Sequence, residues 1–221
     1  MATTPAPLIE PPLKRAVVFV DGQNLFYAAR EAFGYQYPNY DILKLAQRVC
    51  QSQNWNLTQT RFYTGVPDPS DDPMKNGFWT AKLAAMGRQR IIVFSRALRY
   101  RNKTVQLPAG GTHTFLHGEE KGIDVRIALD IMGLAVRNKY DVAVVFSQDQ
   151  DLSEVADEIP IIARQQARWI RIACAYPMSP TRNNRRGING SQWIQIDRKT
   201  YDACIDPKDY RPPKSPLTSS A

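Results

Sequence analysis

The chain has 221 residues, 43% of them hydrophobic, and its 29 basic and 21 acidic residues give a net charge of +8. This length favours one domain over two, and the positive balance favours an anionic partner, with nucleic acid ahead of a membrane surface. No apolar run approaches the roughly 18 residues that span a bilayer, so we expect no membrane partner. Three widely spaced cysteines without a C-x-x-C pair favour neither a zinc site nor a disulfide framework.

Both ends of the chain are rich in proline and small polar residues, which cannot build a core. We therefore expect flexible tails at residues 1–14 and 206–221, and one domain over residues 15–205. The N-terminal segment lacks the apolar stretch of a signal peptide, so a cytoplasmic location is expected. The oligomeric state is not fixed by the sequence, and a homo-oligomer stays open.

Between the tails, predicted strands and helices alternate. A strand at 15–20 is followed by a helix at 23–33, a helix at 41–51 with Asp41 as N-cap, a strand at 57–65 and a helix at 73–86 stopped by Gly87. Next come a strand at 90–94, a polar excursion at 97–118 that suits a hairpin, a long helix at 121–138 and a strand at 141–146. A helix from 152, interrupted near Pro160, and strands at 169–175 and 193–196 complete the pattern. Apolar strands alternating with helices predict an α/β fold with a parallel sheet and helices on both faces.

Acidic residues directly follow two of these strands. Asp21 comes after the run 16–20, and Asp149 and Asp151 come after the run 144–146. In doubly wound sheets, ligands bind beyond the carboxyl ends of the strands. These acids therefore predict a site at that edge, with Asn24 placed to hold a carboxylate or a substrate phosphate.

Each acid also has a structural interpretation. Asp21 is about as well suited to a turn or to capping a helix as it is to a functional site. Asp151 and Glu154 match a capping box, so capping is the favoured role of Asp151, which leaves Asp149 as the better candidate for chemistry. On the long helix, Asp124 faces the core side, whereas Asp130 is expected on the surface, paired with Arg126 four residues earlier.

Clustered carboxylates repel one another unless a cation joins them. Aspartate oxygens without histidine or cysteine suit a hard divalent ion, Mg²⁺ or Mn²⁺. Such a metal beside a basic surface is typical of phosphodiester hydrolysis, in which the metal activates water. A haloacid-dehalogenase-type phosphatase is disfavoured because Gln23 stands where a second aspartate would be needed.

Three segments resemble the signature blocks of NYN domains, which are PIN-like nucleases with a Rossmann-type sheet. The segments are VFVDGQN at 18–24, EKGIDV at 120–125 and VFSQDQDL at 145–152. The resemblance covers about residues 15–176 and implies a metal-dependent ribonuclease site carried by Asp21, Asp124, Asp149 and Asp151. Where family members commonly read S-G-D-S-D-F, this chain carries Gln148, Gln150 and Leu152, so the shape of the loop is expected to differ.

RNA is the expected partner, and two basic stretches are the expected contacts. The candidate residues are Arg99 and Arg101 in the first stretch and Arg182, Arg185 and Arg186 in the second. Tyr63, Trp79 and Tyr100 suit base stacking, although ordinary core packing is the favoured interpretation. The loop histidines His113 and His117 are given no metal role. The predicted activity is that of an endoribonuclease, and the alternative is a weakly active or inactive RNA-binding adaptor with the same fold.

Overall fold

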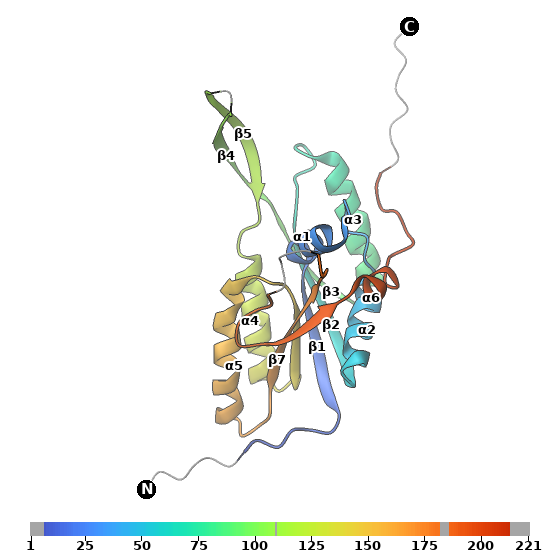
Figure 1. Ribbon diagram of the computed structural model, residues 1–221, viewed down its shortest axis with the longest axis vertical. Coiled ribbons are helices and arrows are strands. Elements are labelled where there is room, and N and C mark those ends of the chain that lie inside the picture. Colours follow the sequence, from blue (N-terminus) through green and yellow to red (C-terminus); the bar gives the residue numbers. More distant parts are fainter. Residues whose placement is uncertain (1–6, 109, 182–185, 213–221) are drawn as a thin grey trace.

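Six parallel strands form the central sheet of the protein. The computed structural model describes residues 7–108, 110–181 and 186–212 (Figure 1). The order of the strands across the sheet is β3-β2-β1-β6-β7-β8, and every neighbouring pair is parallel. The strands are β1 (Lys14–Asp21), β2 (Trp55–Val66), β3 (Ile92–Ala97), β6 (Val142–Phe146), β7 (Arg171–Pro177) and β8 (Gln192–Ile196). The predicted parallel α/β fold is confirmed.

The strand order reverses between β1 and β6. The chain builds outward from β1 to β2 and β3, then returns to the other side of β1 and builds outward again from β6 to β7 and β8. Such a reversal leaves a crevice at the carboxyl ends of the two strands beside the switch. Asp21 ends β1, and Ser147 follows β6, so both residues lie at this switch point.

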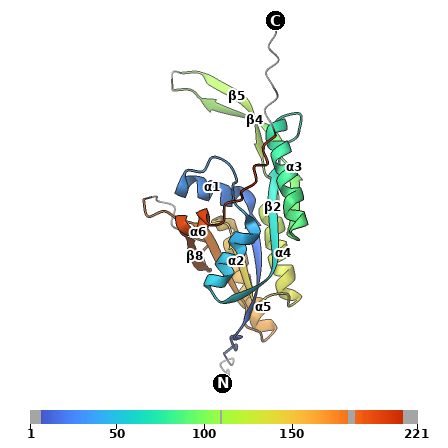
Figure 2. The ribbon, with the colours of Figure 1, turned by 90° about the vertical axis from the view of Figure 1, so that its right-hand side faces the viewer.

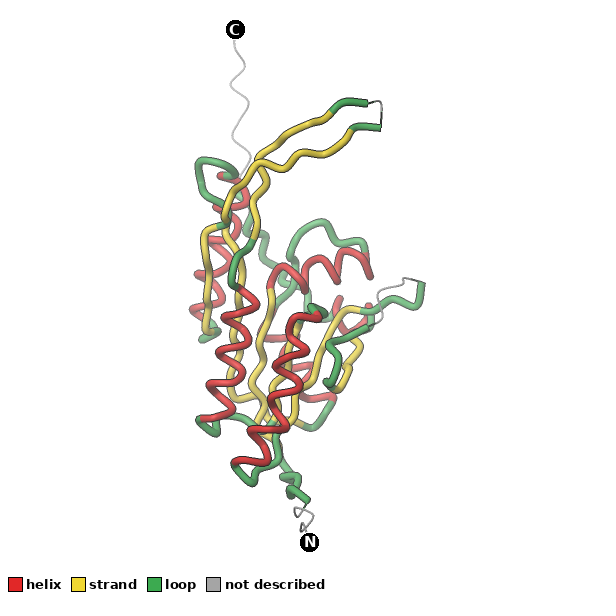
Figure 3. The backbone as a smooth tube through the Cα atoms, turned by 90° about the vertical axis from the view of Figure 1, so that its left-hand side faces the viewer, coloured by secondary structure: helices red, strands yellow, loops and turns green. Residues whose placement is uncertain are grey.

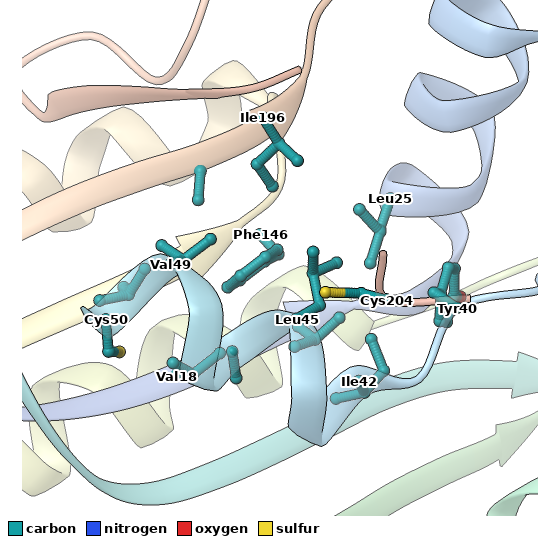
Figure 4. Packing of buried hydrophobic residues seen from close by; sticks show 14 of the residues in the cluster. Val18, Leu25, Tyr40, Ile42, Leu45, Val49, Cys50, Phe146, Ile196 and Cys204 are labelled. Carbon is teal, nitrogen blue, oxygen red and sulfur yellow. The ribbon is translucent and has the colours of Figure 1, made fainter. Parts of the chain in front are cut away.

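Helices cover both faces of the sheet (Figures 1 to 3). The helices are α1 (Gly22–Phe33), α2 (Ile42–Ser52), α3 (Pro73–Arg88), α4 (Ile123–Val136), α5 (Ser153–Gln165) and a short α6 (Arg198–Asp202). Buried side chains of α1, α2 and α3 pack on one face. Figure 4 shows Leu25 of α1 and Leu45 and Val49 of α2 in the same cluster as Val18 of β1. Those of α4 and α5 pack on the other face. Alternate residues of β1 contribute to the two cores, as expected for a strand buried on both sides.

A two-stranded hairpin projects beyond the sheet (Figures 1 and 2). It consists of β4 (Arg99–Gln106) and β5 (Thr112–Glu119), which pair antiparallel between β3 and α4 in the chain. The hairpin expected at 97–118 is therefore confirmed. Its residues are mostly exposed, so it adds surface rather than core.

Several element boundaries differ from the sequence predictions. α3 runs on through Gly87 to Arg88, and α5 passes through Pro160 without a break. Ile159 and Ile162, one residue before this proline and two residues after it, are both buried, and their packing outweighs the hydrogen bond that proline cannot donate. The helix α6 was not predicted, because five residues are too few to show periodicity.

Residues 206–212 do not form the flexible tail that the sequence predicted. Asp206 Oδ2 lies 3.3 Å from the buried Lys82 Nζ, and the ring of Tyr210 lies 4.9 Å from the same ammonium group. Tyr210 also meets Phe78 edge to face. The chain beyond residue 205 thus packs on α3, and residues 1–6 and 213–221 lie outside the described residues. Within the described part of the chain, no helix is long and apolar enough to cross a membrane.

Candidate active site

Asp21 is the most buried acid at the switch point, with 4% of its surface exposed. It follows β1 directly and caps α1, because its Oδ1 accepts the backbone N–H of Asn24 at 3.0 Å. Its Oδ2 accepts the hydroxyl of Ser147 at 3.3 Å, which ties the end of β1 to the end of β6. The N-cap interpretation is confirmed. Capping alone does not explain why Asp21 is buried, because an N-cap works equally well at the surface. The carboxylate can therefore have a second role.

A glycine is needed next to Asp21. A Cβ on Gly22 would lie 2.4 Å from the buried ring of Phe62, so only glycine lets α1 begin this close to β2. The carbonyl of Gly22 also accepts the hydroxyl of the buried Tyr40 at 3.0 Å. The start of α1, and with it Asp21, is therefore fixed by core contacts on both sides.

Asn24 links α1 to the loop after β6. Its Oδ1 accepts the backbone N–H of Gln148 at 2.8 Å. Ser147 Oγ accepts the N–H of Asp149 at 3.2 Å, so Asn24 and Ser147 together set the path of the loop that carries the acids. The sequence suggested a substrate contact for Asn24. Because Oδ1 is engaged, any such role falls to its Nδ2.

The capping roles of Asp149 and Asp151 are the reverse of those predicted. A single 3₁₀ turn, η1 (Gln150–Leu152), precedes α5, and Asp149 caps it by accepting the N–H of Asp151 at 3.0 Å. The N-cap position of α5 is Leu152, and no side chain caps that helix. Asp151 is exposed. The capping box failed because the 3₁₀ turn places the N-cap of α5 at Leu152, one residue later than the motif requires.

Glu120 is the acid that the sequence interpretation missed. It follows the hairpin and is anchored by the backbone N–H of Gly65, at the end of β2, which donates to Glu120 Oε1. The Thr64 hydroxyl lies 3.4 Å from the same oxygen. The sequence signal was its place in the EKGIDV segment, which was matched to the NYN block without any role for its first residue.

Asp124 is half-buried in the first turn of α4, near Glu120 in the chain. Gly122 begins this helix with φ +74°, a left-handed conformation that favours glycine. A Cβ there would lie 2.5 Å from Arg96 Nη1, whose guanidinium donates to the carbonyl of Lys121 at 3.3 Å. The turn that presents Asp124 is thus set by local backbone geometry.

The acids raise one another's pKa. Burial is the largest cause of the raised pKa of Asp21, which reaches about 7, and the charges of Glu120 and Asp124 add to it. Burial also raises the pKa of Asp124, followed by the charges of Asp149 and Asp151. The pKa of Glu120 is raised by burial and by Asp124. Asp124 thus interacts with acids on both sides, which makes it the centre of one electrostatic cluster.

The cluster fits a hard divalent cation by its chemistry, but it is not a closed ligand set. All its donors are carboxylate oxygens, and their repulsion is what a cation relieves. Among the residues that the structure describes, however, no three Asp, Glu, His or Cys side chains come together closely enough to hold one metal ion.

Asp130 is paired as predicted, but it is buried rather than on the surface. Arg126 Nη2 lies 3.0 Å from its Oδ1, while Arg61 and Tyr63 bind its Oδ2 at 2.9 and 2.8 Å. These partners lower the pKa of Asp130 despite its burial. Asp130 therefore links α4 to β2. Tyr63 is only 1% exposed and occupied by this network, so it is no stacking platform for bases.

The two glutamines that depart from the usual NYN loop connect it to a neighbouring segment. Gln148 Nε2 donates to the carbonyl of Arg186 at 2.8 Å, and Gln150 Nε2 donates to that of Gly187 at 3.1 Å. Gln150 Oε1 also accepts the N–H of Asn189 at 3.3 Å. A glycine and a serine at these places could not make these contacts, so the substitutions fix the 186–189 segment beside the acids.

The arginines that were predicted to bind RNA are found on the hairpin, beside the loop of the acids, and outside the described residues. Arg99 is exposed on β4, and Arg101 pairs with Glu119 across the hairpin. Arg186 lies beside the loop of the acids, and its guanidinium donates to Asn189 Oδ1 at 2.9 Å. Arg182 and Arg185 lie outside the described residues. The histidines are on β5, where both flank Phe115, His113 stacked on its ring and His117 edge to face.

Comparison with known families agrees with this geometry. A family described as "NYN domain" matches residues 15–166, which include Asp21, Glu120, Asp124, Asp149 and Asp151. The chain belongs to the NYN domain family. Members of this family are generally nucleases, typically ribonucleases that use divalent metals, so the match supports a nuclease or RNA-related function at a coarse level.

Solved structures and curated proteins add little to the family assignment. A protein of unknown function from Vibrio parahaemolyticus is 20% identical with a TM-score of 0.49, over 84% of this chain and 94% of its own. A ribokinase from Giardia lamblia is 17% identical with a TM-score of 0.33, over 63% of this chain and 41% of its own. Neither likeness is close enough to transfer an activity. No curated protein matches the chain.

Proposed function

We propose that the protein is a metal-dependent endoribonuclease that hydrolyses RNA phosphodiester bonds at the carboxylate cluster. The observation that supports it most is the burial of Asp21 beside other acids at the switch point of the sheet, where its pKa rises to about 7. A fold that needed only an N-cap there would gain nothing from burying a charge among like charges. The family assignment supports the same reaction class.

Asp21, Asp124, Asp149 and Asp151 are the proposed ligands of Mg²⁺ or Mn²⁺, with Glu120 beside them. When bound, such a cation supplies activation of water and neutralisation of charge on the phosphate. The chain itself orients the acids: Ser147 and Asn24 hold Asp21, and the Gly65 N–H holds Glu120. Arg186 and the hairpin arginines Arg99 and Arg101 are the proposed contacts to the RNA backbone.

One observation favours the alternative, an RNA-binding adaptor with little or no activity. The described residues contain no ready-made group of three metal ligands, so an adaptor that kept the acids without a metal would look the same. The two functions differ in one respect: the nuclease needs a cation to close the cluster, whereas the adaptor needs only the basic surfaces.

Incubation of the purified chain with transfer, ribosomal and messenger-like RNA tests the proposal. We expect cleavage with Mg²⁺ or Mn²⁺, none with EDTA, and none from Asp149→Asn in either condition. RNA that is bound but uncut by the parent chain, at every metal tried, would establish the adaptor in its place.

A further inference from the structure

A pocket of about 780 Å³ opens next to the carboxylate cluster. Its walls come from α1, the loop at residues 36–38, the end of β2, the first half of α3 and the base of the hairpin. The volume lies in the range of about 300–1,000 Å³ that is typical of small-ligand sites. None of the four proposed metal ligands lines it, but Glu120 does, so the pocket adjoins the cluster without overlapping those four residues.

Aromatic rings from four segments face this pocket. The aromatic residues that line it are Phe26 and Tyr27 of α1, Tyr37, Phe78 and Trp79 of α3, and Tyr100 of β4. Tyr27 and Tyr37 are 52% and 40% exposed, so they are not held there by core packing. Single exposed aromatic side chains are ordinary, but rings from separate segments around one cavity form a surface for a flat, apolar ligand.

The ring of Tyr100 is fixed in the pocket wall before any ligand arrives. Its hydroxyl accepts the backbone N–H of Asp68 at 3.2 Å, which joins the hairpin to the loop before α3. A Cβ on Gly118, across the hairpin, would lie 2.9 Å from the ring, so glycine makes room for it. A ring held in place in this way loses little conformational entropy on stacking.

The charges around the pocket balance, although the chain carries a net charge of +8. Its acidic members are Asp71, Asp72 and Glu120, and its basic members are Arg30, Lys75 and Arg211. Lys75 is also paired with Asp72 at 2.9 Å. A pocket lined in this way does not select a phosphate group. The amides of Gln23 and Gln36 supply donors and acceptors of the kind that bind the edge of a base.

Glu120 connects the pocket to the cluster. It lines the pocket together with Thr64 and Gly65, which hold it, and its charge raises the pKa of Asp21. We propose that the pocket binds one base of the RNA, that of a nucleotide next to the phosphodiester held at the carboxylate cluster. This inference rests on the proposed ribonuclease function and adds a base-binding subsite to it.

Two mononucleotide-sized probes test the pocket without any cleavage. Adenosine 5′-monophosphate and ribose 5-phosphate differ only by the base, and their binding is measured in EDTA by titration calorimetry. We expect the former to bind more tightly, and Tyr27→Ala to weaken its binding about 5-fold or more, because stacking on one ring is worth about 1–3 kcal/mol. Phe115→Ala is the matched control: Phe115 is also exposed, at 37%, and does not line the pocket.

Cleavage of a short oligoribonucleotide then places the base relative to the cut bond. Replacing one nucleotide at a time by an abasic one should lower kcat/KM most at a position adjoining the cut, and Tyr27→Ala should lose that sensitivity while Phe115→Ala keeps it. RNA cut with no dependence on the base or on Tyr27 would overturn the pocket and leave the nuclease intact. RNA left uncut would overturn the nuclease, and adenosine 5′-monophosphate that binds no more tightly than ribose 5-phosphate would overturn the pocket.

Discussion

Burial and negative charge conflict most directly at Asp21. The side chain is 4% exposed, and its pKa of about 7 means that it prefers to hold a proton at slightly acid pH. An unfolded chain has already lost that proton near pH 4. Keeping Asp21 charged in the folded state therefore lowers the free energy of unfolding, by up to about 4 kcal/mol. The proposed function accounts for this penalty, because a bound cation would need the charge of Asp21.

This conflict predicts the pH dependence of stability without metal. Because the folded pKa is raised, the proton is bound in the folded state and absent from the unfolded one between pH 4 and 7. The stability of the parent chain thus falls as pH rises through that window. Asp21→Asn lacks this loss and keeps the N-cap, so it should be more stable at pH 8 in EDTA, by about 1–4 kcal/mol. Urea unfolding at pH 5 and pH 8 measures the difference, and a less stable variant at pH 8 would refute it.

Replacing Asp21 should lower activity although it raises stability, and replacing Asp149 should lower activity as well. Asp21→Asn and Asp149→Asn are each expected to reduce RNA cleavage about 100-fold or more, since an amide cannot supply the charge that holds a divalent ion. Circular dichroism should show an intact fold. Glu158→Gln is the matched control, an exposed acid on α5 away from the cluster. Near-parent cleavage by either aspartate variant would remove that residue from the site.

A variant at Asp151 distinguishes a role in helix capping from a role in metal binding. In the structure Asp149 caps the 3₁₀ turn and Asp151 is exposed, so Asp151→Ser should leave the melting temperature unchanged. If the carboxylate of Asp151 binds metal, directly or through water, the serine variant should lose activity all the same. Thermal unfolding and cleavage assays on one preparation decide the matter. A fully active serine variant would show that Asp151 has no part in metal binding.

The hairpin of β4 and β5 is the element proposed to bind the RNA backbone. Removing a cation that contacts phosphate lowers affinity and flattens its dependence on salt, by about 0.7 in the log–log slope for each contact on single strands. An Arg99→Ala/Arg101→Ala variant should show both effects. Arg99 should contribute more, because Arg101 is paired with Glu119.

Arg137→Ala/Lys139→Ala provides the control for the hairpin. Both residues are exposed beyond the C-terminal end of α4, where the chain turns back to begin β6. The control removes the same charge from the opposite edge of the sheet. Equal slopes for the two double variants would mean that net charge alone, and not the hairpin, explains the binding.

Capping and proline patterns, which depend only on neighbouring residues, predicted one helix boundary correctly and two others wrongly. Asp41 was predicted as the N-cap of a helix, and it accepts the N–H of Lys44 as expected, because this signal needs only neighbouring residues. The capping box at Asp151 failed because a neighbouring acid, Asp149, captured the free N–H in a tighter turn. Pro160 failed as a helix stop for a different reason, since burial of its neighbours is a property of the packed fold.

At the scale of the whole molecule, the position of the site depends on the order of the strands in the sheet. The hydrophobic periodicity of the sequence does not show that order. The sequence placed Asp21, Asp149 and Asp151 after strands, and those positions are correct. It could not show that β1 and β6 are neighbours, or that β2 would supply the N–H that holds Glu120. Glu120 was therefore missed. The sequence suggested Trp79 and Tyr100 as stacking residues but not the pocket that they line, because the pocket depends on contacts between segments far apart in the chain.

The hairpin projects beyond one end of the sheet (Figure 1). The acids that follow β1 and β6 and the pocket at the end of β2 lie at the carboxyl ends of the strands. The doubly wound order explains this arrangement, because each strand delivers its following loop to the same edge. Under the proposed function, an RNA strand approaching that edge would meet the hairpin arginines, the pocket and the acids. The opposite edge serves stability, as the pairing of Asp141 with Arg15 and Arg168 shows.

Mapping the ends of the cleaved RNA tests the metal-dependent mechanism most directly. Ribonucleases that use histidines as acid and base make the 2′-hydroxyl attack and leave a cyclic phosphate, but His113 and His117 lie on the hairpin strand β5. Attack by water at the carboxylate cluster instead leaves 5′-phosphate and 3′-hydroxyl ends. We expect those ends, full inhibition by EDTA, and unchanged products from a His113→Ala/His117→Ala variant. Cyclic 2′,3′-phosphate ends, or cutting that persists in EDTA, would contradict the account.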